Sequence, residues 1–204
     1  MKNLARLFGL FLVTLPVTSN AVNFSPTMDS YVRSDYPDTN YGASTWMQSG
    51  PDVTNHFHNY LQFNLSSIPS SSIINSAILY QYIFETNGPT IALIHPIKND
   101  TAWSETTLTW NNRPPGTIEC GTCLTPPTTV QWMQLDVKTA VQNWVNGSWE
   151  NYGLRVITAG DFYFKTYTKE NSSFQPYLTV DYSPGTKVVT PSLGVIKAFF
   201  KPTL

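Results

Sequence analysis

The sequence contains little charge. Only 12% of its 204 residues are Asp, Glu, Lys or Arg, about half the share in an average soluble protein. The 12 basic and 13 acidic side chains leave no basic excess to neutralise a phosphate backbone. We therefore expect no nucleic-acid partner.

Long apolar runs are also missing. The run from 7 to 17 is too short to span a bilayer, so no membrane span is predicted. It follows Lys2 and Arg6 and precedes the small residues Ser19-Asn20-Ala21, the pattern of a cleaved secretory signal. We assign residues 1–21 as a signal peptide. Its removal leaves 10 basic and 13 acidic side chains, a net charge of about −3.

Cysteine is nearly absent. The two cysteines, Cys120 and Cys123, lie close together in a loop rich in Pro and Gly. In an oxidising compartment this spacing favours a local disulfide. A zinc site is disfavoured because there is no second cysteine pair and the histidines lie elsewhere, and no strand–helix context supports a redox motif.

Catalytic signatures are lacking as well. We find no glycine-rich phosphate loop, serine elbow or zinc-binding helix motif. Glu105, Asp161 and Glu170 are carboxylates, but no spacing marks any two of them as a glycosidase pair. The chain is therefore predicted not to be an enzyme.

What is abundant is aromatic and turn-forming residues. Aromatics make up 14% of the chain, with 15 prolines and 11 glycines. Short β-rich runs separated by turn signals predict an all-β fold, a β-sandwich of the jelly-roll type. The runs are 27–34, 45–49, 56–65, 73–85, 90–97, 107–110, 130–137, 154–158, 162–168 and 177–182.

One short helix is predicted among the strands. Apolar residues recur at helical spacing from Val137 to Val145, with Asp136 as a cap and Gly147 just past the end. Such a short helix is not stable alone and must pack on the sheets. We place one domain at 22–183, followed by a C-terminal tail at 184–204 that carries an apolar patch.

Two further segments have predicted packing roles. Trp103, which precedes the expected strand 107–110, and Trp110, which ends it, are interpreted as core anchors. In the run 73–85 both faces are largely apolar, and we expect the helix or the tail to cover the face of Tyr80, Tyr82 and Phe84. The alternative is that this face is an exposed interaction surface.

The order of these motifs resembles the DNRLRE domain, also called carbohydrate-binding module family 96, over nearly the whole mature chain. The similarity is carried by segments 38–42, 60–69, 74–79, 103–105, 109–114, 136–137, 141–144, 151–154 and 176–182. The resemblance implies a non-catalytic β-jelly-roll. Some members of that family bind acidic polysaccharides such as alginate.

A ligand surface is predicted on the run 162–168 and just beyond it. Strand alternation puts Tyr163, Lys165, Tyr167 and Lys169 on one face, where rings can stack on sugars and ammonium groups can meet carboxylates or hydroxyls. Arg33 is added as a candidate for the same surface. The alternative is an ordinary outer face with packed tyrosines and solvated lysines.

A structural calcium ion is a second hypothesis. Asp35, Asp38 and Asn40 offer the oxygen ligands that calcium prefers, although the same side chains also stabilise turns without metal. The predicted function is a secreted, non-catalytic module that binds extracellular polysaccharide. The alternative is an adhesive or self-assembling structural protein that uses residues 185–204 for strand addition between copies.

Overall fold

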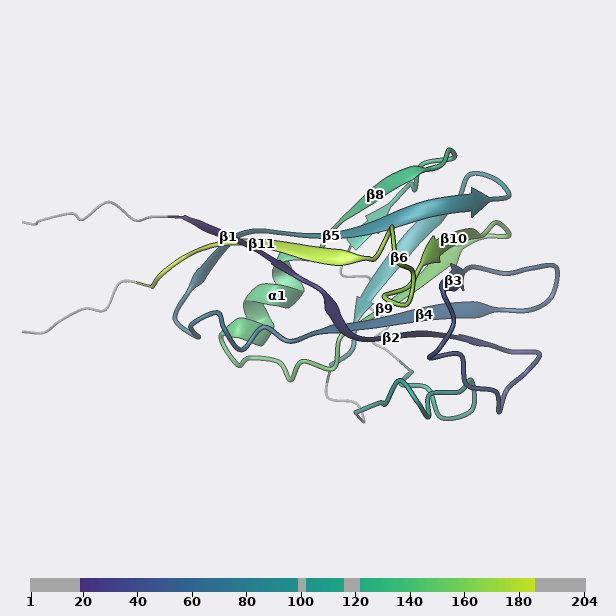
Figure 1. Cartoon of the computed structure of the whole chain (residues 1–204), viewed down its shortest axis with the longest axis horizontal. Coiled ribbons are helices and arrows are strands. Elements are labelled where there is room, and N and C mark those ends of the chain that lie inside the picture. Colours follow the sequence, from purple (N-terminus) through teal and green to yellow (C-terminus); the bar gives the residue numbers. More distant parts are fainter. Residues whose placement is uncertain (1–18, 99–101, 116–121, 186–204) are drawn as a thin grey trace, which may run out of the picture.

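The computed structural model describes residues 19–98, 102–115 and 122–185. Over these residues the chain forms two antiparallel β-sheets packed face to face, with one short helix (Figure 1). Sheet A has the strand order β1-β11-β5-β10-β3, with β8 paired to β5, and sheet B has the order β2-β4-β9-β6-β7. The predicted all-β sandwich with a short packed helix is confirmed.

Most strands lie where the turn signals placed them. Sheet A consists of β1 (Asn20–Phe24), β3 (Trp46–Ser49), β5 (Ile73–Thr86), β8 (Gln131–Asp136), β10 (Phe164–Tyr167) and β11 (Tyr177–Ser183). Sheet B consists of β2 (Pro26–Arg33), β4 (Phe57–Phe63), β6 (Ile91–Pro96), β7 (Thr122–Leu124) and β9 (Leu154–Ala159). Only β1 and β7 were not expected. β1 includes the last two residues of the predicted signal peptide, Asn20 and Ala21, and it pairs with β11.

Strand β5 organises sheet A. Tyr80 pairs with Gln134 of β8 on one side and with Tyr177 of β11 on the other. Three residues later, Ile83 pairs again with β8 and, on the other side, with β10. β11 and β10 therefore follow one another along the same edge of β5, and the segment 168–176 connects them.

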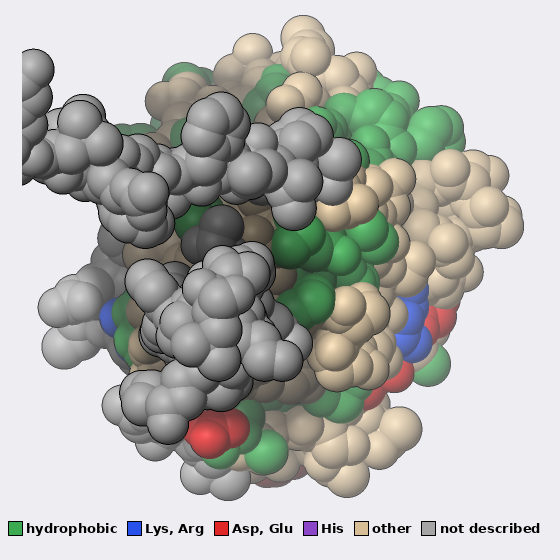
Figure 2. All heavy atoms as spheres, turned by 90° about the vertical axis from the view of Figure 1, so that its left-hand side faces the viewer, with side chains coloured by type: hydrophobic (Ala, Val, Ile, Leu, Met, Phe, Trp, Pro, Cys, Tyr) green, Lys and Arg blue, Asp and Glu red, His purple; other side chains and the backbone are tan. Residues whose placement is uncertain are grey.

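The core lies between the sheets. On β5 the inward residues Ala77, Leu79, Gln81 and Ile83 are all fully buried, while the residues between them are partly exposed. This period of two is what a strand with one face on a core requires. The end of the sandwich seen in Figure 2 shows few charged side chains among its coloured atoms.

Helix α1 (Lys138–Val145) closes the core at one end. Its predicted apolar residues Ala140, Val141, Trp144 and Val145 are buried in the same cluster as the inner face of β5. Asp136 accepts a hydrogen bond of 2.9 Å from the Lys138 backbone N–H, although the residue at the N-cap itself is Val137. Among the described residues no helix has the length and apolar character needed to cross a bilayer.

The strand expected at 107–110 is absent, and this prediction was wrong. The backbone there forms turns: the N–H groups of Thr107 and Leu108 both donate to the Ser104 carbonyl. The Asn112 side chain then accepts from Thr109 and donates to the Thr107 carbonyl, so local Asx bonding replaces a ladder.

The turns at 104–112 lie over sheet B. Trp103 and Leu108 are buried in a second cluster with Val32 and Tyr60, and Trp110 packs beside them. The Trp103 indole donates to the Tyr152 carbonyl at 2.9 Å. Both tryptophans therefore anchor packing as predicted, but they cover the outer face of sheet B rather than filling the space between the sheets.

Two predictions lie partly outside the described residues. Cys120 falls there, while Cys123 is in β7, so the disulfide stays a prediction. Residues 186–204 also fall there, and the role of the tail is likewise untested.

Candidate functional site

The outer face of sheet A carries a continuous row of aromatic side chains. We call it the outer aromatic strip, and it consists of Phe84, Tyr167, Tyr82, Phe174, Trp132, Tyr177 and Tyr80. All seven side chains remain at least partly exposed. Five segments contribute to it, namely β5, β8, β10, β11 and the segment 168–176 that leads into β11.

The rings of the strip contact one another directly. Phe84 stacks on Tyr167 with centroids 4.4 Å apart, and Tyr82 stacks on Phe174 at 4.1 Å. Trp132 meets Tyr177 edge to face at 5.3 Å. Ring contacts of this kind hold the side chains in fixed orientations, so the strip is a preformed surface.

Of the two segments expected to cover this face, the tail lies outside the described residues, and the helix does not cover it. The buried side of α1 joins the core on the inner face of β5, so the expectation that the helix covers Tyr80, Tyr82 and Phe84 was wrong. What covers part of the strip is its own loop residue Phe174, which remains 36% exposed.

A small hollow lies beside the strip. It has a volume of about 270 Å³ and is lined by Ser25, Trp132, Ser172, Ser173, Gln175, Pro176 and Tyr177. Two aromatic rings and several hydroxyl or amide groups therefore meet around one space. A few polar groups among aromatic walls are what a small-molecule or sugar subsite requires.

A larger hollow of about 700 Å³ lies near α1, but its aromatic residues are not available. Phe63 and Trp144, which line it, are 1% and 7% exposed because they belong to the core. Their ring faces are already packed against other side chains. We therefore assign the candidate site to the outer aromatic strip and its hollow.

The alternation of buried and exposed side chains that was predicted for the run 162–168 is largely present in the structure. Phe164, Thr166 and Thr168 are buried, whereas Tyr163, Lys165, Tyr167 and Lys169 are partly exposed. Phe162 differs from the prediction, since it is 40% exposed instead of facing inward with Phe164. Only Tyr167 of the four candidates belongs to the outer aromatic strip.

Tyr163 and Lys165 are joined by Glu85. The Tyr163 hydroxyl and the Lys165 ammonium both donate to Glu85 Oε1, at 2.8 and 2.7 Å. The hydrogen bond from Lys165 lowers the pKa of Glu85, and the Glu85 carboxylate raises the pKa of Tyr163 to about 12. The positive charge of Lys165 is therefore already paired with the Glu85 carboxylate.

The other two candidates point elsewhere. Arg33 lies in β2 of sheet B, where its guanidinium pairs with both carboxylate oxygens of Asp35. Lys169 turns its ammonium toward Glu105 and Glu170, at 3.0 and 2.5 Å. The structure thus does not bring the five predicted residues together on one surface.

The predicted calcium ligands are engaged in turn contacts. Asp35 holds Arg33, Asp38 accepts from Asn111, and Asn40 donates its amide to the Glu105 and Leu108 carbonyls. These bonds tie the 35–42 loop to the 104–112 turns. A calcium ion at these residues stays a prediction.

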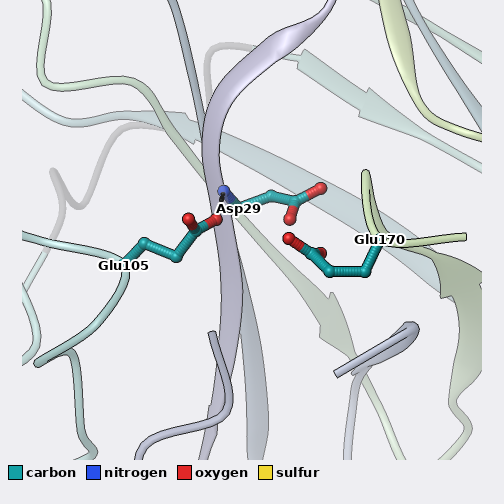
Figure 3. A group of neighbouring side chains, drawn as sticks. All are labelled: Asp29, Glu105 and Glu170. Carbon is teal, nitrogen blue, oxygen red and sulfur yellow. Dashed lines mark hydrogen bonds between the residues drawn. The ribbon is translucent and has the colours of Figure 1, made fainter. Parts of the chain in front are cut away.

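A different acidic group gathers deeper in the molecule. One carboxylate oxygen from each of Asp29, Glu105 and Glu170 lies within 4.8 Å of the others (Figure 3). Burial raises the pKa of Asp29 to about 8. The sequence analysis named Glu105 and Glu170 only as carboxylates without a partner, and it missed Asp29.

These features define a class of protein: a β-sandwich that presents aromatic rings and a partly polar hollow of about 270 Å³ on the outside of one sheet. The comparison with family models is consistent with that class. The model for carbohydrate-binding module family 96 matches residues 20–182, and the chain belongs to that family.

Similar curated proteins are much longer than this chain. A gellan lyase from Bacillus sp is 30% identical over 108 residues, which are 52% of this chain and 4% of that protein. The tRNA nuclease WapA of Bacillus subtilis (strain 168) is 25% identical over 187 residues, 80% of this chain and 8% of that protein. The chain thus corresponds to a small part of each relative.

Sequence reasoning found four residues of the strip, with Tyr167 assigned to a separate ligand surface, and missed the other three. Tyr80, Tyr82 and Phe84 were noted as a face, but Trp132, Phe174 and Tyr177 were not connected to it. Pairing of β5 with β8 and β11 brings them together, and single-strand alternation contains no information about pairing. The available sequence signal was that these strands carry an aromatic residue on the face that points away from the core.

Proposed function

We propose that this chain is a secreted, non-catalytic module that binds extracellular polysaccharide on the outer aromatic strip. The observation that carries the proposal is the convergence of Trp132 and Tyr177 on a hollow that also offers Ser172, Ser173 and Gln175. Membership of a carbohydrate-binding family supports it. The partial similarity to a gellan lyase, an enzyme named for a polysaccharide, agrees with an extracellular role.

The strip suits an extended sugar chain for physical reasons. Pyranose rings have apolar C–H faces that pack on aromatic planes, and their hydroxyls need hydrogen-bond partners at the edges. In each stacked pair the two rings cover one plane of each other, so a sugar chain would contact the planes and edges that stay exposed along the strip. Hydroxyl and amide groups at the hollow supply the partners.

Charge plays a small part in this mode of binding. Lys165 is paired with Glu85 at 2.7 Å, and Lys169 is directed toward carboxylates. Neither ammonium is therefore a free counter-charge for an acidic ligand. We infer that stacking rather than ion pairing dominates, so binding is expected to depend weakly on salt.

Alanine substitution of the strip tests the proposal. Trp132→Ala and Tyr177→Ala are each expected to weaken binding about tenfold, because an aromatic stack contributes about 1–1.5 kcal/mol. Polysaccharide microarrays identify the ligand of the unmodified protein. Affinity gel electrophoresis and calorimetry on that ligand then give the change in dissociation constant.

Tyr36→Ala is the matched control. Tyr36 is 55% exposed in the 34–45 loop, outside the strip, so its loss removes a surface aromatic without touching the hollow. Unchanged affinity in both strip variants, or no retention of the unmodified protein on any polysaccharide, would refute the proposal. Release of sugar ends during the same incubations would refute its non-catalytic part.

A further inference from the structure

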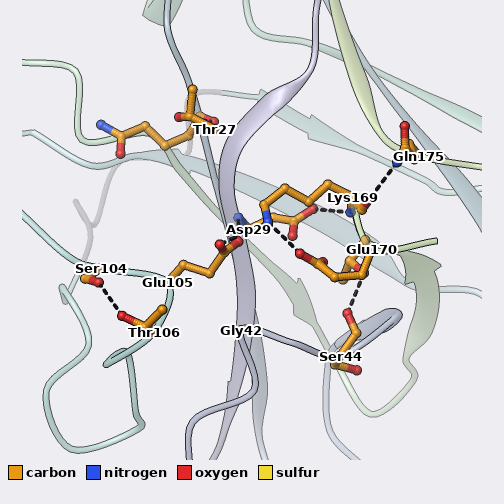
Figure 4. Close-up of polar contacts among 12 residues, drawn as sticks. Thr27, Asp29, Gly42, Ser44, Ser104, Glu105, Thr106, Lys169, Glu170 and Gln175 are labelled. Atoms are coloured by element: carbon orange, nitrogen blue, oxygen red, sulfur yellow. Dashed lines mark hydrogen bonds and ion pairs between the residues drawn. The ribbon is translucent and has the colours of Figure 1, made fainter. Parts of the chain in front are cut away.

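Three segments far apart in the chain meet at the cluster of Asp29, Glu105 and Glu170. Asp29 lies in β2, Glu105 in the turns over sheet B, and Glu170 in the segment between β10 and β11. The Asp29 backbone N–H donates to Glu105 at 2.8 Å, and Asp29 in turn accepts from the Lys169 backbone N–H at 2.8 Å (Figure 4). The positions of the Asp29 and Glu105 carboxylates are therefore fixed by backbone N–H groups, whereas Glu170 is held by the Lys169 ammonium.

The negative charge of the cluster is only partly compensated. When ionised, the three carboxylates face one ammonium, that of Lys169, which pairs with Glu105 Oε2 and Glu170 Oε1. Like charges this close in a partly buried setting repel each other strongly. Either a proton on Asp29, whose pKa is raised to about 8, or a further cation relieves this repulsion.

Two oxygens of the cluster lack a hydrogen-bond partner within the part of the chain that the structure describes. They are Asp29 Oδ1 and Glu170 Oε2, both shielded from solvent. Asp29 as a whole has an exposed fraction of 0%. A buried carboxylate oxygen without a donor is costly, and here the Asp29 and Glu170 carboxylates face each other across the space between them (Figure 3).

The three carboxylates indicate which kind of ion would bind. Carboxylate oxygens are the ligands of hard cations, and calcium holds them at about 2.3–2.6 Å, so ligands on opposite sides of one ion lie about 4.6–5.2 Å apart. The separation of at most 4.8 Å among the three oxygens fits this span. The Glu105 and Glu170 side chains are 19% and 24% exposed, so the cluster lies near the surface even though its two unpaired oxygens are shielded from solvent.

We propose that Asp29, Glu105 and Glu170 bind one calcium ion. Asp29 Oδ1 and Glu170 Oε2 are its first ligands, and Lys169 remains the counter-ion of the other Glu170 oxygen. This site is separate from Asp35, Asp38 and Asn40, whose side chains are already used in turns.

The ion would brace the segment that completes the polysaccharide site. Glu170 begins the stretch that carries Ser172, Ser173, Phe174 and Gln175, and Gln175 donates back to the Lys169 carbonyl at 2.6 Å. Fixing Glu170 to β2 therefore fixes one wall of the hollow. Calcium binding itself does not depend on the proposed function, and it is measured without any sugar.

Calcium titration of the intact, EDTA-dialysed protein tests the site. Calorimetry is expected to give one ion per chain with a dissociation constant of about 0.1–1 mM, as in extracellular calcium modules. At 10 mM calcium the melting temperature should rise by about 3–10 °C. Magnesium at the same concentration should give a clearly smaller rise, because it demands a tighter octahedral cage.

Glu170→Gln is the diagnostic variant. It keeps the shape of a side chain that is 24% exposed but removes one charge, so its melting temperature should no longer respond to calcium. Without calcium it should melt no lower than the unmodified protein, since one repulsion is relieved. Glu150→Gln, at an exposed glutamate outside the cluster, should keep the full calcium response.

Several results would overturn the proposal. If the unmodified protein shows neither binding heat nor a melting shift up to 10 mM calcium, the cluster is held by Lys169 and a proton alone. If Glu170→Gln binds calcium as well as the unmodified protein, the ion is located elsewhere. Equal stabilisation by magnesium would overturn the choice of calcium.

Discussion

At the scale of single residues, the structure separates side chains that the sequence placed together. Lys165 and Lys169 alternate along one run, yet one ammonium pairs with Glu85 on the open face and the other is directed toward Glu105 and Glu170. Alternation predicts the face from which a side chain departs. It does not predict where the end of a long lysine side chain finds its partner.

His58 provides a test at this scale. Burial, together with the charges of Arg155 and Arg113, lowers its pKa from 6.5 to about 3, and its ring lies 4.9 Å from that of Trp110. The unfolded chain therefore binds a proton between about pH 6.5 and 3 that the folded protein does not. Stability is fully present above pH 6.5 and falls as the pH drops, by at most about 1.4 kcal/mol per pH unit from this group.

His58→Gln should remove this part of the acid sensitivity. Urea unfolding at pH 7 and pH 4.5 is expected to show a smaller loss of stability in the variant than in the unmodified protein. His56→Gln, two residues away and exposed, is the control and should retain the full loss. Equal pH dependence in all three proteins would show that His58 is protonated in the folded state.

At the scale of elements, what was predictable followed from local patterns. The alternating run of β5 and the helical spacing of α1 were both correct because each element buries one face of its own sequence. The 107–110 segment was wrong because Asn112 hydrogen bonds outweigh the β propensity of Thr-Leu-Thr-Trp. β7 was missed because three residues carry almost no periodicity, and its existence depends on pairing with β6.

Gly153, just before β9 begins beside β4, is expected to tolerate no larger side chain. Gly153 has a φ of +87°, and a Cβ there would lie 2.2 Å from the Leu61 carbonyl oxygen. Gly153→Ala therefore has both backbone strain and a clash with main chain, and we expect a loss of about 2–4 kcal/mol in unfolding free energy.

Gly160 supplies the comparison. It also has a positive φ, +101°, but a Cβ at this position would meet nothing within 4 Å. Gly160→Ala should then lose only the conformational part, about 1 kcal/mol. Urea unfolding of the two variants measures the difference, and equal losses would mean that the close approach of Gly153 to β4 contributes nothing.

At the scale of the whole molecule, the open question is whether one copy acts alone. The sandwich forms from residues 19–185, with β1 and β3 at the two ends of the main strand path of sheet A. An unpaired sheet edge can accept a strand from another copy, which is the basis of the self-assembly alternative. Polysaccharide binding through the outer aromatic strip requires no such partner, because the strip belongs to one chain.

Size-exclusion chromatography of residues 19–204 and of residues 19–185 distinguishes the two functions. If the module binds sugar as proposed, both proteins should elute as monomers over a wide concentration range and should bind the same polysaccharide with the same affinity. Polymers that grow with concentration in the longer protein and vanish in the shorter one would favour assembly through the tail. In that case the strip would have to be tested again as a contact between copies, since an aromatic surface binds apolar protein faces as readily as sugars.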